Sequence, residues 1–339
     1  MSIPIITVIV PVHNEEEYID RLMESLQVQT YRRLQVILID GGSTDSTPAR
    51  IDAWASKWNM GPDSNMGIVE VIHTSDKGVS ASRNIGLNHA SGDLITFVDG
   101  DDWLEKDALE RMYRCMQESG ADLVGMDFES IYPDTSGSET EQGDGGSRYT
   151  EYSPAEFQSE HILRGDVHVW GRLYRSSRIG RLRFREGLTI GEDMLFVSEY
   201  AACCVRIAHM EYRGYNYFRN PAGAMGRPFT SAAMDQVRCF RLEQELLGNI
   251  APELADSDEL KSNMLISVML TAGRIAFLDK EIRKDEEHKG YIRELRSTIK
   301  EYKSRGAMKL LDRGYRIKVR LFRALPGLYL ALYHTHRPK

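Results

Sequence analysis

The segment ITVIVPVHNEEEYIDRLMESLQVQT, residues 6–30, decides the fold class of this 339-residue chain. It opens with an unbroken apolar run rich in β-branched residues, which is typical of a strand covered on both faces. Apolar residues then recur at helical spacing between Tyr18 and Leu26. A buried strand that leads directly into an amphipathic helix is the building unit of an α/β sheet.

The same alternation continues through about the first 120 residues. Apolar runs at 34–40, 67–75 and 93–99 predict three further strands, and the segments between them have helical spacing. Strands that alternate with helices predict a parallel sheet between two helix layers, a three-layer α/β/α fold. A stretch rich in Gly, Ser and acidic residues at about 133–149 predicts a flexible surface loop.

Only helical patterns follow beyond about residue 228. Because the chain exceeds the usual size of one domain, we expect an α/β domain over residues 1–227 and a mainly helical region over 228–339. The whole chain has a net charge of −7, yet residues 300–339 hold eleven basic and two acidic side chains. An acidic body with a basic tail argues against nucleic acid as the main partner.

The basic tail alternates Leu, Phe, Ile and Tyr with Lys and Arg over residues 315–339. This pattern predicts a basic amphipathic helix that lies on an anionic membrane surface, or else one that packs on the α/β domain. The uncharged stretch ALPGLYLALYHTH is too short to span a bilayer, and no signal-peptide pattern opens the sequence. The helices between about 231 and 300 could instead form a homodimer interface.

Polar residues follow three of the predicted strands. They are His13 and Asn14 after the first, Asp40 with two glycines at the end of the second, and Asp99-Gly100-Asp101 after the fourth. Ligands of parallel α/β sheets bind at the carboxyl ends of the strands. We therefore expect these three turns to meet at one crevice.

The stretch LITFVDGDDW, residues 94–103, gathers three carboxylates at the end of a buried strand. Carboxylates placed this closely repel one another and are costly to bury unless a cation or a donor compensates them. The sequence has neither GxGxxG nor GxxxxGK[ST], so phosphates would be held through a metal. Oxygen ligands select Mg²⁺ or Mn²⁺, and Asp99 and Asp101 are the predicted metal ligands.

Taken together, these motifs resemble those of the family 2 glycosyltransferases, which are inverting enzymes with the GT-A fold. The resemblance covers roughly residues 5–225. It rests on VIVPVHNEEEYI, VILIDGGSTDST, KGVSASRNIGL, ITFVDGDDWL and IGEDMLF, in the order and approximate spacing of the family. The resemblance implies a UDP-sugar donor and a glycan or lipid-linked saccharide acceptor. It also implies a cytoplasmic enzyme, peripheral on the inner face of the plasma membrane, that builds cell-surface polysaccharide.

The resemblance further assigns roles to single residues. Asp40 would accept the imino N–H of uracil, Arg83 would reach the base or the pyrophosphate, and Asp193 would be the general base. Transfer with inversion needs such a base on the face opposite the leaving UDP, and a divalent cation stabilises the departing diphosphate. The implied acceptor residues are Trp170 and Glu192. The implied nucleotide-sugar contacts are Pro11, His13, Asn14, Glu16, Asp40, Ser43, Arg83, Asp99, Gly100 and Asp101.

Simpler interpretations remain beside these. Asp40 could merely cap its turn, Arg83 could be a surface arginine, and Asp193 could be an acid of a helix N-terminus. Trp170 could equally be a core residue. For the whole chain, the alternatives are a sugar-nucleotide pyrophosphorylase, which usually opens with a Gly-rich, Arg-containing loop that this chain lacks, and an inactive glycosyltransferase-like scaffold.

Overall fold

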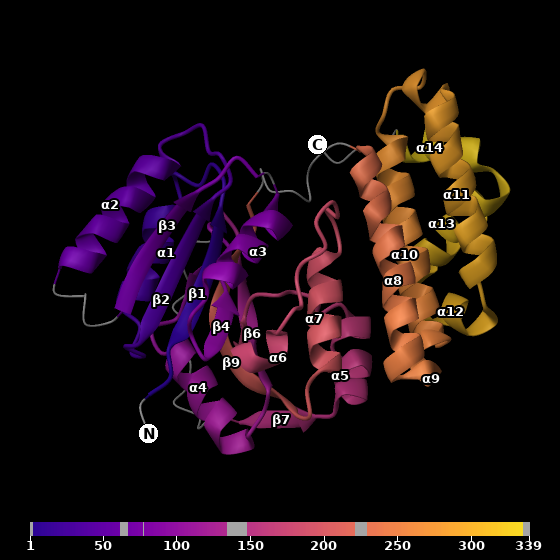
Figure 1. The fold of residues 1–339 in the computed structure, drawn as a ribbon. Coiled ribbons are helices and arrows are strands. Elements are labelled where there is room, and N and C mark those ends of the chain that lie inside the picture. The colour runs from indigo at the N-terminus through magenta and orange to yellow at the C-terminus, as the bar shows by residue number, and fades with distance from the viewer. Residues whose placement is uncertain (1–2, 62–66, 77, 134–147, 221–228, 335–339) are drawn as a thin grey trace. The chain divides into compact units, whose positions relative to one another are not determined.

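The computed structural model describes residues 3–61, 67–76, 78–133, 148–220 and 229–334 (Figure 1). The predicted flexible loop at 133–149 therefore lies almost wholly outside the described residues. The chain divides into two compact units. The first comprises Met1–Gln158, Val167–Gly187 and Glu199–Gly223, and the second comprises Ser159–Asp166, Leu188–Ser198 and Ala224–Lys339.

The predicted boundary at residue 227 lies near the start of the long segment of the second unit. The sequence did not indicate that two short stretches, Ser159–Asp166 and Leu188–Ser198, also belong to that unit. Their patterns continue the strand and helix order of the α/β domain, so local spacing gives no sign of where they pack.

Within the described residues, the first unit is built on a nine-stranded sheet. Eight strands follow one another in the order β3-β2-β1-β4-β8-β6-β9-β5, and β7 pairs with β9. The strands are β1 (Ile6–Val12), β2 (Leu34–Asp40), β3 (Gly67–His73), β4 (Leu94–Phe97), β5 (Trp103–Leu104), β6 (Leu123–Ile131), β7 (Tyr149–Tyr152), β8 (Arg172–Arg175) and β9 (Ile207–Phe218).

The first four long strands of the chain are parallel, as the sequence predicts. The register pairs Val12 with Asp40 and Asp40 with His73, so the carboxyl ends of β1, β2 and β3 lie at one edge. The second half of the sheet departs from the expected parallel arrangement, because β8 runs antiparallel to both β4 and β6. The sheet is therefore mixed.

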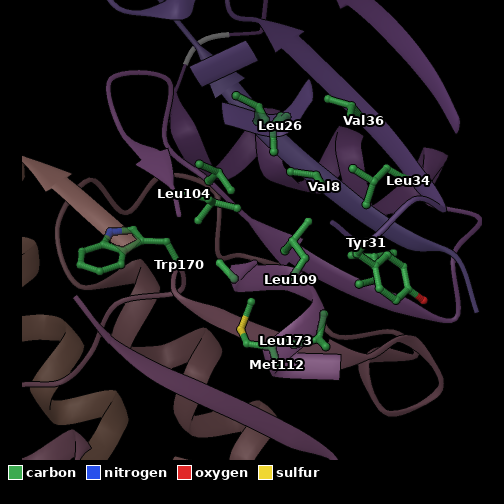
Figure 2. Packing of buried hydrophobic residues seen from close by; sticks show 14 of the residues in the cluster. Val8, Leu26, Tyr31, Leu34, Val36, Leu104, Leu109, Met112, Trp170 and Leu173 are labelled. Carbon is green, nitrogen blue, oxygen red and sulfur yellow. The ribbon is translucent and has the colours of Figure 1, made fainter. Parts of the chain in front are cut away.

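Helices cover both faces of this sheet. Val8 and Val10 of β1 share a core cluster with residues of α1, α2 and α4, while α3 packs against β1 and β2 from the other face. Figure 2 shows part of this cluster, with Val8, Leu104 and Leu109 close together. The helices up to residue 202 are α1 (Ile19–Gln27), α2 (Thr47–Met60), α3 (Val79–His89), α4 (Ala108–Ser119), α5 (Pro154–Glu160), α6 (Ser176–Ile179) and α7 (Glu192–Ala202). The first seven residues of α7 belong to the second unit.

The second unit has a separate core around α10, which packs against α8, α11, α12, α13 and α14. Val268, Ile299 and Phe322 are fully buried there. The helical character predicted for 228–339 is confirmed over residues 229–334. None of the described helices is both long and apolar enough to cross a membrane. The helices are α8 (Asp235–Ile250), α9 (Pro252–Ala255), α10 (Asp258–Ala276), α11 (Glu286–Tyr302), α12 (Arg305–Leu310), α13 (Arg313–Ala324) and α14 (Pro326–His334).

Candidate functional site

The loops that follow β1 and β2 are joined by hydrogen bonds, as the convergence of strand ends predicts. The backbone N–H of Asn14 donates to Ser43 Oγ at 2.9 Å, and Asn14 Oδ1 accepts from the backbone N–H of Thr44 at 2.8 Å. His13 Nδ1 lies 3.1 Å from the carbonyl oxygen of Gly41. Asn14 has φ of 58°, a left-handed conformation that asparagine tolerates better than most residues. Together these contacts fix the first rim of the site.

Glu16 reinforces the same junction. Its Oε2 accepts hydrogen bonds from the backbone N–H and the hydroxyl of Ser46, at 2.9 and 2.6 Å. Two such donors to one carboxylate lower the pKa of Glu16. Its carboxylate is thus engaged with the start of α2, which gives it a role in holding the loop whether or not a ligand is present.

Asp40, the last residue of β2, is 3% exposed. Its Oδ1 accepts from the backbone N–H of Ser43 at 2.9 Å, so Asp40 does cap its turn. Its Oδ2 also lies 3.0 Å from Nδ1 of His73, a partner that no sequence pattern indicated. Asp40 therefore does more than cap its turn.

The interpretation of Arg83 as a surface arginine is wrong. Arg83 is 2% exposed on α3, and its Nη2 lies 2.9 Å from Oδ1 of Asp99. Removing a charged arginine from water costs free energy, so a buried arginine needs a partner that compensates its charge. Arg83 therefore brings a positive charge to the carboxylate turn after β4, where it pairs with Asp99.

The turn itself places its three aspartates in different surroundings. Asp102 is fully buried, with Oδ2 accepting from the Tyr215 hydroxyl at 2.6 Å and Oδ1 accepting from the backbone N–H of Phe218 at 2.7 Å. Burial, followed by the charges of Asp99 and Asp101, raises the pKa of Asp102 well above its usual range. Both oxygens are occupied by β9, so Asp102 is a structural link between the turn and that strand.

Asp101 is more open to a ligand. One of its carboxylate oxygens accepts from the Asn220 side chain at 3.2 Å, and its backbone oxygen accepts from Arg21 at 2.7 Å. Burial and the neighbouring Asp99 raise the pKa of Asp101. Asp99 and Asp101 thus repel each other across Gly100, which disfavours the charged pair unless a cation is added.

Glu15 is a site residue that the sequence analysis missed. A Cβ placed on Gly100 would lie 3.0 Å from Glu15 Cγ, so Glu15 lies directly beside the carboxylate turn. Burial, followed by the charges of Asp101, Asp99 and Asp45, raises the pKa of Glu15 to about 8. The run of three glutamates at 15–17 was the only available signal, and it did not show which of them turns inward.

Asp99 and Asp101 fit a divalent cation. The charges of Asp99 and Asp101 both act on Glu15, while Arg83 pairs with Asp99 and Arg21 donates to the backbone oxygen of Asp101. Glu15 Oε2 is buried and has no hydrogen-bond partner among the described residues. Hard oxygen ligands with excess negative charge are what Mg²⁺ and Mn²⁺ prefer.

Trp170 is a core residue, and only 4% of it is exposed (Figure 2). It stacks between His168 and Tyr215, with ring centroids 4.1 and 4.3 Å away. So little exposed surface leaves the predicted role as an acceptor wall without support. The half-buried rings of His168 and Tyr217 form the accessible edge of this stack.

Glu192 and Asp193 lie in the second unit, in the first turn of α7. Gly191, just before them, has φ of 91°, and a Cβ there would lie 2.7 Å from Cβ of Cys239. Thr189 is held by Asp235 of α8, whose Oδ2 accepts from its backbone N–H at 3.2 Å. The segment that carries the predicted base is therefore anchored on α8.

Comparisons with known proteins identify the family and the fold. The model of the family "Glycosyl transferase family 2" matches residues 7–180, just over half of the chain. Glycosyltransferase GlyA of Streptococcus pneumoniae serotype 4 is 29% identical over 240 residues, which are 68% of this chain and 32% of that protein. The chain spans 32% and 60% of the length of two curated relatives that it matches.

Solved structures are similar over the whole chain. The crystal structure of S. aureus TarS 1–349 in complex with UDP-GlcNAc has a TM-score of 0.66 and 20% identity, covering 97% of this chain and 90% of that one. Mannosyltransferase PcManGT of Pyrobaculum calidifontis, in complex with GDP-Man and Mn²⁺, has a TM-score of 0.54 and 17% identity, covering 100% and 89%. At these identities the likeness shows the fold, which is GT-A.

The family match covers the strands and loops that carry Asp40, Arg83, Asp99 and Asp101, all of which lie in the first unit. The fold, the motifs and the family model therefore agree, and the chain belongs to the glycosyl transferase family 2.

Proposed function

We propose that this protein is an inverting glycosyltransferase that moves a sugar from a UDP-sugar to a hydroxyl of a glycan or lipid-linked acceptor. One observation carries the proposal: a buried carboxylate, Asp40, and a carboxylate turn, Asp99-Gly100-Asp101, lie at the ends of strands that each pair with β1. Asp40 would accept a hydrogen bond from the nucleobase, and the carboxylate turn would hold a metal ion that binds the diphosphate. Two such sites at one edge of the sheet suit a nucleoside diphosphate. The TarS neighbour in complex with UDP-GlcNAc supports a UDP-sugar as the donor.

The residues divide the work of donor binding. Asp40 would accept the N3–H of uracil, while Arg83 would place positive charge near the pyrophosphate. Asp99 and Asp101 would hold Mn²⁺ or Mg²⁺, which when bound neutralises the negative charge that grows on the diphosphate. The Mn²⁺ complex of the PcManGT neighbour supports a divalent metal for this fold.

Asp193 would act as the general base. In the proposed reaction its carboxylate takes the proton of the acceptor hydroxyl, and the oxygen attacks the anomeric carbon. The bond between that carbon and the UDP oxygen breaks as the new glycosidic bond forms on the opposite face, and UDP leaves. The family motif Gly191-Glu192-Asp193 and the anchoring of this segment on α8 support the assignment.

The acceptor would reach the protein from a membrane. Exposed apolar side chains lie on α13, on α14 and between them, in a region rich in Lys and Arg. They are Ile317, Leu325, Leu328 and Leu332, each between 47% and 56% exposed. Apolar side chains among basic ones suit the interface of an anionic bilayer, where lipid-linked saccharides are presented. His168 and Tyr217 offer ring faces against which an acceptor sugar could pack.

The first test is calorimetric titration of UDP, and then GDP, into the protein with Mn²⁺ and with EDTA. We expect UDP binding that needs both the metal and Asp101, so that Asp101→Asn lowers the affinity at least about tenfold through loss of one charged ligand. Asp279→Asn, an exposed aspartate of the second unit, is the control and should bind as the wild type does. Binding of neither nucleotide under any condition would contradict the proposed function.

A further inference from the structure

His73, the last residue of β3, joins two carboxylates. Its Nδ1 lies 3.0 Å from Oδ2 of Asp40 and its Nε2 lies 3.2 Å from Oδ1 of Asp52 on α2. The register of β2 and β3 pairs Asp40 directly with His73, so the contact follows from the sheet itself. An imidazole can donate to two carboxylates only when both ring nitrogens carry protons, so this geometry suits the charged ring.

His73 is one of two partners that stabilise the charged form of Asp40. Burial alone would raise the pKa of Asp40, but hydrogen bonds from His73 and Ser43 outweigh it and lower the pKa below its usual value. An ionised carboxylate only accepts hydrogen bonds. It can therefore accept the N3–H of uracil, whereas the N3 of cytosine has no hydrogen to offer.

We propose that His73 is a positioning residue of the nucleobase site, which orients Asp40 as an acceptor and so sets the preference for uracil over cytosine. His73 acts through Asp40, and Asp52 of α2 holds the other ring nitrogen of His73 in place. The inference rests on the proposed function, because it requires that Asp40 meet the base.

The arrangement gives nucleotide binding a pH dependence. The charged and titratable groups that face His73 are Asp40 of β2 and Asp52 of α2. The hydrogen bond to Asp40 raises the pKa of His73, burial opposes this, and the bond to Asp52 adds to the rise. Because a neutral ring has one N–H, it satisfies one carboxylate only. The charged ring, which holds Asp40 and Asp52 together, is present below the pKa of His73. The affinity for UDP is therefore highest there, and it decreases as the pH rises through that pKa.

The test measures the dissociation constants of UDP and CDP with Mg²⁺ between about pH 6 and pH 9. His73→Asn keeps a neutral donor near the Nδ1 position but reaches only Asp40. We expect about tenfold weaker UDP binding at about pH 6, a smaller UDP-over-CDP preference, and loss of the part of the pH profile that comes from His73, while any part that comes from Glu15 is kept. The matched control is His89→Asn, since His89 is an exposed histidine of the same unit, 2.7 Å from a carboxylate oxygen of Glu70.

The outcomes separate this inference from the proposed function. If the wild type binds UDP with metal, and His73→Asn matches it in affinity, base preference and pH profile, the role of His73 is wrong while the proposed function stands. If the wild type binds no UDP, both are wrong. Should His73→Asn melt well below the wild type, Asp52→Asn replaces it, because this variant leaves His73 in place and is expected to flatten the same pH profile.

Discussion

The carboxylates at and beside the turn after β4 differ in burial and in hydrogen-bond partners. Asp102 is sealed by Tyr215 and the backbone of β9, whereas Asp101 keeps contacts that a ligand could share. Glu15 is the extreme case, since it faces both Asp99 and Asp101 and has a buried oxygen without a partner among the described residues. Carboxylates that lie close together in the fold thus differ in what they contact: Asp102 links the turn to β9, Asp101 shares its carboxylate with Asn220, and Glu15 keeps one buried oxygen without a partner among the described residues.

Glu15 makes the stability of the metal-free protein depend on pH. Its pKa is about 8 when folded, against an ordinary value of 4.5, so between these values the folded state holds a proton that the unfolded state has lost. The contribution of Glu15 to the free energy of unfolding is therefore highest below about pH 4.5, and it decreases as the pH rises towards 8. We expect Glu15→Gln, which cannot ionise, to lose less melting temperature than the wild type between about pH 5 and pH 8.

Thermal melts in EDTA check this prediction. Glu17→Gln is the control, because Glu17 lies in the same loop but is exposed. Equal decreases in melting temperature for the wild type and Glu15→Gln would show that Glu15 is ionised in the folded protein.

Residues at the ends of strands and helices fix the loops and helix starts of this protein. Hydrogen bonds between the loops after β1 and β2 bring His13 and Asn14 to Asp40 and Ser43. In the second unit, the side chains of Ser257, Asp285, Ser304 and Asp312 cap α10, α11, α12 and α13. Such caps are visible in the sequence, while the loop junctions depend on the sheet order.

The start of α7 depends on a glycine. Gly191 combines a positive φ with close contact to Cys239, so an alanine there meets both backbone strain and a clash. We expect Gly191→Ala to destabilise the protein by about 1–3 kcal/mol and to displace Asp193, lowering the turnover number. Gly187→Ala is the matched control, because Gly187 also has a positive φ but open space around its Cα.

Melting temperature and initial transfer rate are the two measurements. Gly187→Ala should lose only the part of the stability that comes from strain, and it should keep more activity. An equal loss for both variants would mean that contact with Cys239 contributes nothing.

The whole molecule is polarised in charge. Residues 300–339 carry a net charge of +9 from eleven basic and two acidic side chains, so the remainder carries −16 within the total of −7. The last helices add exposed apolar side chains to that positive charge. A basic and apolar end on an acidic body suits attraction to anionic lipid without attraction to nucleic acid.

Vesicle co-sedimentation checks this surface. We expect the protein to bind vesicles that contain phosphatidylglycerol and to ignore pure phosphatidylcholine. The pair Arg320→Glu with Arg323→Glu should weaken binding by at least about 2 kcal/mol, at roughly 1 kcal/mol per basic residue. Lys284→Glu with Lys289→Glu makes the same change in net charge on exposed residues outside the tail, and should bind as the wild type does.

Two other results would contradict membrane docking. Equal binding by both double variants would assign the attraction to overall charge rather than to the tail. A concentration-dependent dimer that is lost in Leu328→Ser with Leu332→Ser would assign the exposed apolar face to a second copy of the chain.

The order of the elements, the strand-end turns and the resemblance to the family follow from the sequence alone. The periodicity of strands and helices is a local property, and the turn Asp99-Gly100-Asp101 is one contiguous segment. Both can therefore be recognised in the sequence without knowledge of the fold. Three features became visible in the tertiary structure alone. Arg83 is buried against Asp99, and His73 lies between Asp40 and Asp52. The segment that carries Asp193 belongs to the second unit. These are contacts between residues far apart in the chain, and they depend on sheet register and side-chain packing, which no local pattern records.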